Sequence, residues 1–152
     1  MSIHARYVHT NLIAHDWQGL AAFYQDVFGC IPVPPERNLR GEWLERATGL
    51  EGAHLKGIHL RLPGWGTDGP TLEIFQYSDM PDPGERTPNR PGLAHLAFSV
   101  ENLDEAVRRV LEAGGGQVGE IVRLPIEGAG TVAFAYVTDP EGNIIELQRW
   151  EY

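Results

Sequence analysis

The hydrophobic residues form two helical patterns along the chain. In residues 17–28 apolar side chains recur every three or four positions, and Asp16 and Gly29 are suited to begin and end a helix there. The same spacing recurs in residues 103–111, after the N-cap residue Asn102 and before a run of glycines. Both segments are amphipathic, so we expect each helix to lie with its apolar side on a sheet.

The remaining hydrophobic runs predict strands, because they are rich in β-branched and aromatic residues. The six clearest runs are residues 6–13, 54–62, 71–77, 93–100, 131–138 and 144–150, with weaker candidates at 30–33 and 118–124. Turn-forming sequences separate them, among them the Asp-Pro-Glu-Gly-Asn segment at residues 139–143. Residues 79–91 contain four prolines and no periodic pattern, which indicates a linker.

That linker divides the chain into two halves of the same order, strand–helix–strand–strand–strand. His9 opens a strand before the first helix as His95 does before the second, and Glu73 lies in a late strand as Glu146 does. The first half is longer, which places an insertion near residues 41–52, where a short helix could form. We therefore expect an internal duplication. The predicted modules are residues 1–78 and 92–152, joined by the linker 79–91.

Each predicted module thus carries one histidine and one glutamate on equivalent strands. Because side chains alternate along a strand, all four should lie on the sheet face that is not packed against a helix. A single strand histidine is more often a structural hydrogen-bonding group, but a symmetric placement of two imidazoles and two carboxylates favours a metal site. Such a set suits a divalent ion such as Zn, Ni, Co, Fe or Mn.

Composition narrows the class of protein and of partner. With 152 residues, 42% hydrophobic and 22% charged, the chain can build a globular core. A net charge of −9 with scattered basic residues argues against nucleic acid and anionic membranes as partners. Cys30 is the single cysteine, no apolar run is long enough to span a membrane, and the N-terminus does not look like a secretory signal. We expect a cytoplasmic protein with a small-molecule substrate.

Three other features receive a plain structural interpretation. Residues 64–69 fit a Gly-x-Gly-x-x-Gly pattern, but a strand follows them rather than a helix, so we expect a hairpin loop and no dinucleotide site. Cys30 follows a helix-ending glycine and is expected to be a buried small hydrophobe rather than a nucleophile. His59 and Arg61 alternate on the third strand and could face the cavity, but we interpret them as part of a solvated strand face.

The sequence resembles the vicinal oxygen chelate superfamily, which includes glyoxalase I, extradiol dioxygenases, methylmalonyl-CoA epimerase and fosfomycin- and bleomycin-resistance proteins. The segments that carry the resemblance are Tyr-Val-His9-Thr-Asn-Leu, Thr-Leu-Glu73-Ile, Gly-Leu-Ala-His95-Leu-Ala-Phe-Ser-Val and Asp-Pro-Glu-Gly-Asn-Ile-Ile-Glu146-Leu. The resemblance covers essentially the whole chain. It implies an α+β fold of two paired βαβββ modules that form a cupped mixed sheet around one metal site.

The resemblance also implies a function. The metal ligands of glyoxalase I match His9, Glu73, His95 and Glu146. In such lyases and isomerases the metal chelates vicinal oxygens of a small carbonyl compound, and a carboxylate shifts a proton through an enolate or enediolate. Glu146 is the expected catalytic base and Glu73 the alternative. A metal-dependent dioxygenase and an antibiotic-sequestering resistance protein remain the alternative functions, and relatives suggest a homodimer.

The resemblance to glyoxalase I is weaker where that enzyme holds glutathione. It usually has Arg and Asn where this chain has Ile13 and Tyr77. An apolar or aromatic substrate body is therefore expected, with poor activity towards the glutathione hemithioacetal of methylglyoxal. The expected substrate-binding residues are Asn11, Phe75, Tyr77 and Trp150.

Overall fold

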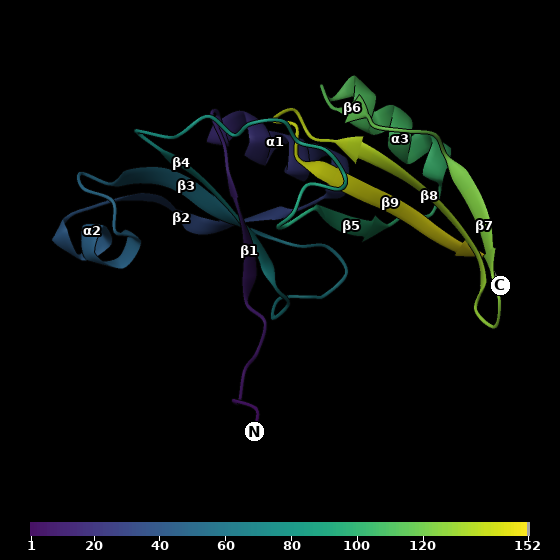
Figure 1. The fold of residues 1–152 in the computed structure, drawn as a ribbon, viewed down its shortest axis with the longest axis horizontal. Helices are drawn as coiled ribbons and strands as arrows, with labels where there is room; N and C mark the ends of the chain where they lie inside the picture. The colour runs from purple at the N-terminus through teal and green to yellow at the C-terminus, as the bar shows by residue number, and fades with distance from the viewer. Residues whose placement is uncertain (152) are drawn as a thin grey trace. The chain divides into compact units, whose positions relative to one another are not determined.

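The computed structural model describes residues 1–151, which divide into two compact units, one ending at Pro81 and one beginning at Asp82. Each unit has a mixed sheet with one long helix against it (Figure 1). The strand order is β1-β4-β3-β2 in the first unit and β5-β9-β8-β6 in the second, where β7 also pairs with β8. The predicted α+β class of two βαβββ-type modules is confirmed.

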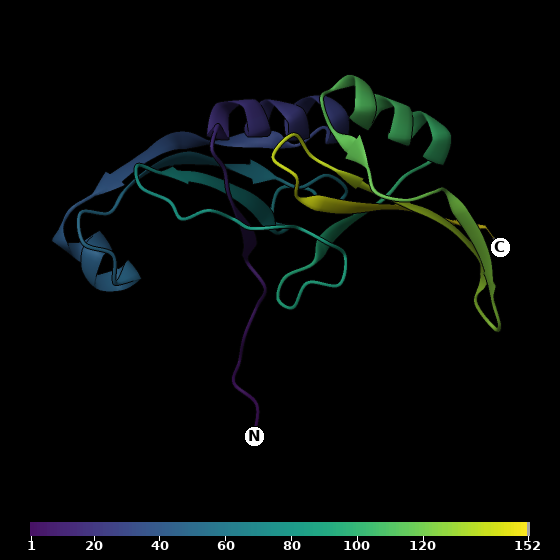
Figure 2. The same cartoon turned by 45° about the horizontal axis from the view of Figure 1, so that its top comes forward.

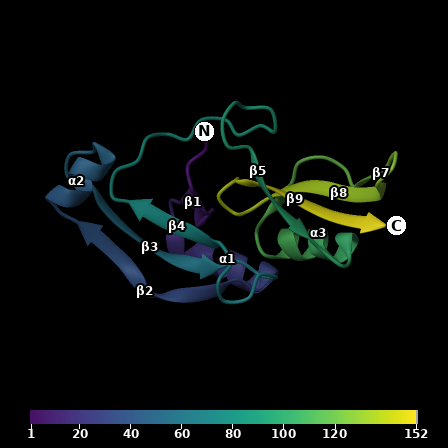
Figure 3. The same ribbon diagram turned by 90° about the horizontal axis from the view of Figure 1, so that it is seen from below.

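The first unit contains four strands and two helices. They are β1 (His9–Ile13), α1 (Trp17–Phe28), β2 (Ile31–Arg40), α2 (Glu42–Thr48), β3 (His54–Arg61) and β4 (Thr71–Tyr77). The edge strand β1 pairs with β4 in parallel, whereas β4 with β3 and β3 with β2 are antiparallel. Figure 3 shows these strands side by side in that order.

Helix α1 forms where the periodicity predicts it and covers one face of this sheet (Figure 2). The Asp16 side chain accepts a hydrogen bond from the backbone N–H of Gly19, and Gly29 ends the helix in a left-handed conformation with φ of 69°. Its buried side chains are Leu20, Ala21, Phe23 and Tyr24, and the buried strand residues on the helix side are Ile58, Leu60, Leu72 and Ile74. Each buried aliphatic side chain stabilises this interface by roughly 1.5–3 kcal/mol.

Strand β2 is much longer than the weak candidate at residues 30–33. It continues past Pro34 and Pro35 to Arg40, with a shift in pairing register between Val33 and Arg37. Proline lacks the N–H that a central strand needs, which is why the sequence pattern predicts an early end. Because β2 is an edge strand, the irregularity accommodates both prolines and pairing with β3 resumes beyond them.

The insertion in the first half forms helix α2, as residues 42–47 predict. Leu44, only 6% exposed, packs against the buried Ala53 and Leu55. Three partly buried side chains, Leu39, Phe75 and Tyr77, pack on the same group. Strand alternation puts Leu55 on the face of the sheet opposite α1. Helix α2 therefore packs on that face, at one end of the sheet (Figure 2).

The second unit repeats this plan. It comprises β5 (His95–Ser99), α3 (Leu103–Glu112), β6 (Gly116–Gln117), β7 (Val122–Ile126), β8 (Gly130–Thr138) and β9 (Ile144–Glu151). The edge strand β5 pairs with β9 in parallel, and the short strands β6 and β7 share one edge of β8. In α3 the Asn102 side chain accepts from the backbone N–H of Glu105, as the sequence predicts. The buried residues Leu103, Val107 and Val110 mark the side of α3 that is shielded from solvent.

Residues 78–94, which include the predicted linker, form no helix or strand. Much of this stretch belongs to the second unit and is attached to its β8–β9 turn. One guanidinium nitrogen of Arg86 donates to the carbonyl of Glu141 and to the side-chain oxygen of Asn143, both at 2.8 Å. The carboxylate of Asp139, a side chain that is almost completely buried, in turn accepts from the backbone N–H groups of Glu141 and Asn143.

The N-terminal segment departs from its prediction. The expected strand 6–13 begins only at His9, because its partner strand β4 begins at Thr71, directly after Gly69 and Pro70. Residues 6–8 keep two bonds to this region: Thr71 N–H donates to the Val8 carbonyl, and the Arg6 guanidinium donates to the Asp68 carbonyl at 2.8 Å. No helix within residues 1–151 is long and apolar enough to cross a membrane.

Candidate metal centre

In the first unit, four polar side chains meet on the face of the sheet opposite α1, which we call the open face. Strand β1 places Asn11 opposite Glu73, and β3 places His59 opposite the same glutamate. His9 lies two residues before Asn11 and therefore points to the same side. Glu73 is thus flanked by β1 and β3 side chains, and only 9% of its surface is exposed.

The carboxylate of Glu73 is held at both oxygens. Asn11 Nδ2 lies 2.8 Å from Oε1, and His59 Nε2 lies 2.7 Å from Oε2. His9 Nε2 is 3.6 Å from Oε1. One ligand atom from each of His9, His59 and Glu73 lies within 4.8 Å of the other two, which fits donors around a single ion with bonds of about 2.1 Å. Two imidazoles and a carboxylate suit a divalent transition metal.

The prediction of a solvated His59 is wrong. Its side chain is only 18% exposed and hydrogen-bonded to Glu73. Burial lowers the pKa of His59; the Glu73 carboxylate opposes this shift, and the charges of Arg37 and His9 add to it. The ring is therefore biased towards the neutral form that can ligate a metal or donate to a carboxylate. Alternation along β3 does not by itself place His59 beside Glu73; the β3–β4 register makes the two residues neighbours.

The second unit repeats the pairing of histidine and glutamate. In the parallel pair β1–β4, His9 lies opposite Thr71, two residues before the glutamate; in β5–β9, His95 lies opposite Ile144, again two residues before Glu146. The ring of His95 stands edge-on to Tyr136, with 5.2 Å between the centroids. The two predicted ligands of each unit therefore lie on adjacent strands in the same register.

Glu146 also has two hydrogen-bond donors. Gln148 Nε2 lies 2.7 Å from its Oε2, and the hydroxyl of Tyr136 donates to the carboxylate. Burial raises the pKa of Tyr136, and the charge and hydrogen bond of Glu146 raise it further. Tyr136 lies opposite Glu146 as His59 lies opposite Glu73, so the two occupy equivalent positions. Sequence reasoning did not consider Tyr136 and interpreted His59 as part of a solvated face, because neither belongs to a motif.

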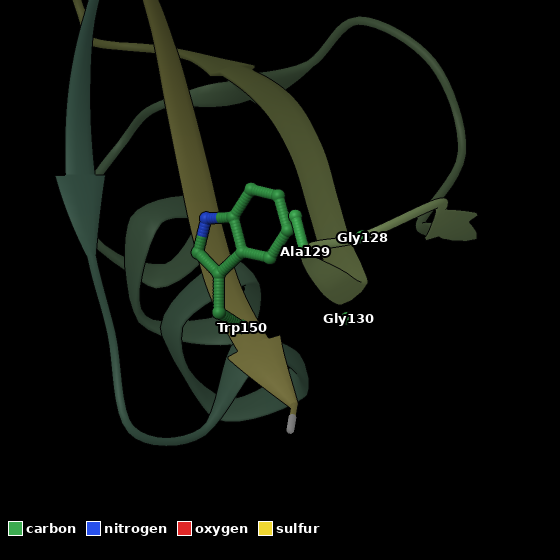
Figure 4. A pocket seen from close by; sticks show the side chains of 4 residues that line it. All are labelled: Gly128, Ala129, Gly130 and Trp150. Carbon is green, nitrogen blue, oxygen red and sulfur yellow. The ribbon is translucent and has the colours of Figure 1, made fainter.

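The predicted substrate-binding residues divide between the units. Asn11 is bonded to Glu73, and Phe75 and Tyr77 follow that glutamate on the open face, with the Phe75 ring 6.1 Å from that of His59. Trp150 lies on β9, where its Nε1 donates to Gln148 at 2.9 Å. Its indole lines a separate pocket with the turn residues 128–130, as Figure 4 shows.

Two other sequence features carry no chemistry of their own. Cys30 is buried, and burial raises the pKa of its thiol to about 11, which leaves almost no thiolate near neutral pH. The glycine-rich segment 64–69 lies in the loop between β3 and β4, as predicted.

Comparisons with known proteins identify the family of the chain. The sequence pattern of the Glyoxalase/Bleomycin resistance protein/Dioxygenase superfamily matches residues 6–147. The uncharacterized protein YaeR of Escherichia coli (strain K12) is 31% identical over 143 residues, 91% of this chain and 92% of YaeR. A lactoylglutathione lyase of Salmonella typhimurium is 28% identical over 142 residues, 93% of this chain and 90% of the lyase.

A third relative matches only in part, and a solved structure supports the fold. Biphenyl-2,3-diol 1,2-dioxygenase 3 of Rhodococcus globerulus is 38% identical over 64 residues, 42% of this chain but only 32% of that enzyme. The crystal structure of a glyoxalase family protein from Bacillus cereus superimposes with a TM-score of 0.82 at 21% identity, covering 99% of this chain and 97% of the other. The chain belongs to the glyoxalase/bleomycin resistance protein/dioxygenase superfamily.

Proposed function

We propose that the chain is a metal-dependent enzyme of the glyoxalase type, a lyase or isomerase acting on a small carbonyl substrate. The observation that carries the proposal is the repetition of one His–Glu pair in both units at the same strand register. In each unit the glutamate lies two residues beyond the position opposite the histidine. Unrelated polar residues have no reason to keep one register twice, whereas residues with a shared chemical task do.

The proposed metal ligands are His9, Glu73, His95 and Glu146. Two imidazoles and two carboxylates fit Zn, Ni, Co, Fe or Mn, and the two negative charges balance that of a divalent ion. When bound, the ion would act as a Lewis acid on two neighbouring oxygens of the substrate.

Glu146 is the proposed general base that takes the proton next to the substrate carbonyl, and Glu73 is the alternative. Glu73 is buried and held at both oxygens by Asn11 and His59, which favours a fixed ligand. Glu146 is only half-buried, so a substrate reaches its carboxylate more easily. Gln148 and Tyr136 orient Glu146 from two sides.

A second candidate is a metal-dependent dioxygenase, which the donors in the first unit favour. His9, His59 and Glu73 together are two imidazoles and one carboxylate, a set typical of non-haem iron oxygenases. Oxygen uptake by the Fe(II)-loaded protein with a catechol separates this function from the first. A resistance protein that only sequesters an antibiotic has no need for the paired ligands.

Metal content tests the ligand assignment. Protein loaded with Ni²⁺, Co²⁺ or Zn²⁺ and freed of excess ion is expected to hold about one ion per chain by elemental analysis. His9→Ala and His95→Ala should each weaken binding by several kcal/mol, because each removes a direct ligand. The exposed His15→Ala is the control and should bind as the parent does.

The outcomes of this experiment separate the possible sites. Unchanged metal binding in His95→Ala would overturn the four-residue assignment. If binding survives in His95→Ala but is lost in both His9→Ala and His59→Ala, the first unit binds the ion by itself.

The substrate is proposed to have an apolar or aromatic body. Ile13 and Tyr77 offer no charged or amide group for a tripeptide, and Phe75 adds a ring beside His59. Losing one charged contact typically costs about 1.5–3 kcal/mol, or roughly ten- to two-hundred-fold in specificity. We therefore expect poor turnover of the glutathione hemithioacetal of methylglyoxal by the Ni-, Co- or Zn-loaded protein. A kcat/KM of about 10⁵ M⁻¹s⁻¹ or more would make it an efficient glyoxalase I instead.

We also propose that the chain forms a homodimer and that its ligand is a small molecule. Support for the dimer comes from the family, and from the edge strands β1 and β5, each of which pairs with a single strand. Those edges leave backbone groups available for further pairing.

A further inference from the structure

On the open face of the first unit, Arg37 lies beside the candidate metal centre. The β2–β3 register places it opposite Gly57, one alternation step from His59 on β3. Strand alternation therefore puts Arg37, His59 and Glu73 on the same side of the sheet. Two residues along a strand span roughly 7 Å, so Arg37 is about that far along the strand direction from the His59–Glu73 pair.

Gly57 leaves the space between Arg37 and Phe75 free of an intervening side chain. A Cβ at this position would come within 2.0 Å of the Ile74 carbonyl oxygen and 2.6 Å of Cδ1 of Phe75. The Phe75 ring thus lies close over the Gly57 backbone. On the open face, the ring of Phe75 therefore lies between the metal-ligating groups and the position of Arg37 on β2.

The charge of Arg37 is not neutralised within residues 1–151, because none of the described carboxylates pairs with it. One guanidinium nitrogen donates to the carbonyl of Pro35. The guanidinium of Arg37 therefore keeps its positive charge on the face of the sheet that carries His9, His59 and Glu73.

From this arrangement we infer that Arg37 binds a carboxylate at the end of the substrate remote from the metal. The substrate class is a chelating compound with an aromatic or apolar body and an anionic far end. Its body lies against Phe75, and its carboxylate meets the planar guanidinium, whose paired N–H groups match two carboxylate oxygens. This inference rests on the proposed function, because it takes the chelated end to lie at His9 and Glu73.

Two hydroxamates test the inference. Both chelate a metal through two adjacent oxygens, but 4-carboxybenzohydroxamate adds a carboxylate across the ring, whereas benzohydroxamate does not. With the Ni-loaded protein, titration calorimetry should give at least about tenfold tighter binding of the carboxylated compound, the lower end for a charged hydrogen-bonded contact. Arg37→Met should abolish that preference without weakening benzohydroxamate, and Arg37→Lys should keep part of it.

Arg61→Met is the matched control, since Arg61 lies two residues from His59 on the other side and on the same face. It should retain the full preference. Equal binding of both compounds by the parent protein, or a preference lost in Arg61→Met and kept in Arg37→Met, would overturn the role of Arg37 and leave the metal site standing. If benzohydroxamate fails to bind the loaded protein at all, the proposed function falls, and this inference with it.

Discussion

At the residue scale, each carboxylate of the two His–Glu pairs is held by a side chain from the neighbouring antiparallel strand. His59 does this for Glu73 and Tyr136 does it for Glu146. Partners of this kind orient a metal ligand and limit its motion, so they affect metal affinity without touching the ion. The Nδ1 of His59 lies 3.4 Å from the Thr71 hydroxyl, which gives both ring nitrogens a polar neighbour.

Substitution of His59 should therefore weaken metal binding. His59→Ala is expected to lower Ni²⁺ affinity about 10- to 100-fold, because Glu73 loses a donor at one oxygen. His59→Gln should recover most of the affinity, since its amide can still donate. Competition against a fluorescent chelator measures both. Parent-like affinity in His59→Ala would contradict the prediction, and equal weakness of the two variants would identify His59 as a direct ligand.

The motif residues of the candidate site could be found from the sequence, whereas their partners could not. His9, Glu73, His95 and Glu146 stand out because the duplication repeats them. His59 lies fourteen residues before Glu73 and becomes its neighbour only through the antiparallel β3–β4 register. Register depends on where each strand begins and ends, and side-chain alternation alone does not specify it.

At the scale of secondary structure elements, the β8–β9 turn fixes the start of the strand that carries Glu146. Asp139 is 2% exposed and accepts from the backbone N–H groups of Glu141 and Asn143 and from the Asn143 amide. Asp139→Ala would leave those donors unpaired inside the turn. We expect the free energy of unfolding, measured by urea denaturation, to fall by about 3 kcal/mol.

The control for this turn variant is Asp68→Ala, which removes an exposed carboxylate from the β3–β4 loop. It should change the stability by no more than about 0.5 kcal/mol. A loss below about 1 kcal/mol for Asp139→Ala would mean that water replaces the lost bonds and that the turn does not depend on this side chain.

Helices and strands for which all sequence features agree were predictable, and those for which the features conflict were not. Helices α1 and α3 combine an apolar stripe with a capping side chain, so their positions follow from the sequence. The sequence predicts a β2 that is too short, because Pro34 and Pro35 disfavour a strand. An edge strand nevertheless tolerates both prolines where its pairing register shifts. The tertiary context decides such cases.

At the scale of the whole molecule, the duplication divides the proposed ligands equally between two units. Each unit has its own sheet, its own helix and one His–Glu pair. One pair alone offers two ligands, and a transition metal in a protein site usually takes at least three. The proposed four-ligand site therefore needs both units, supplied either by one chain or by two.

The last prediction is a homodimer, with a sedimentation mass of twice the 16.9 kDa chain at micromolar concentration. Mixing His9→Ala with His95→Ala then reports which chains supply each ion. If ligands come from both protomers, a mixed dimer contains one intact set and recovers about one ion per two chains. If each chain supplies all four, the mixture recovers none. Each variant alone is the control, and a stable monomer would contradict the dimer.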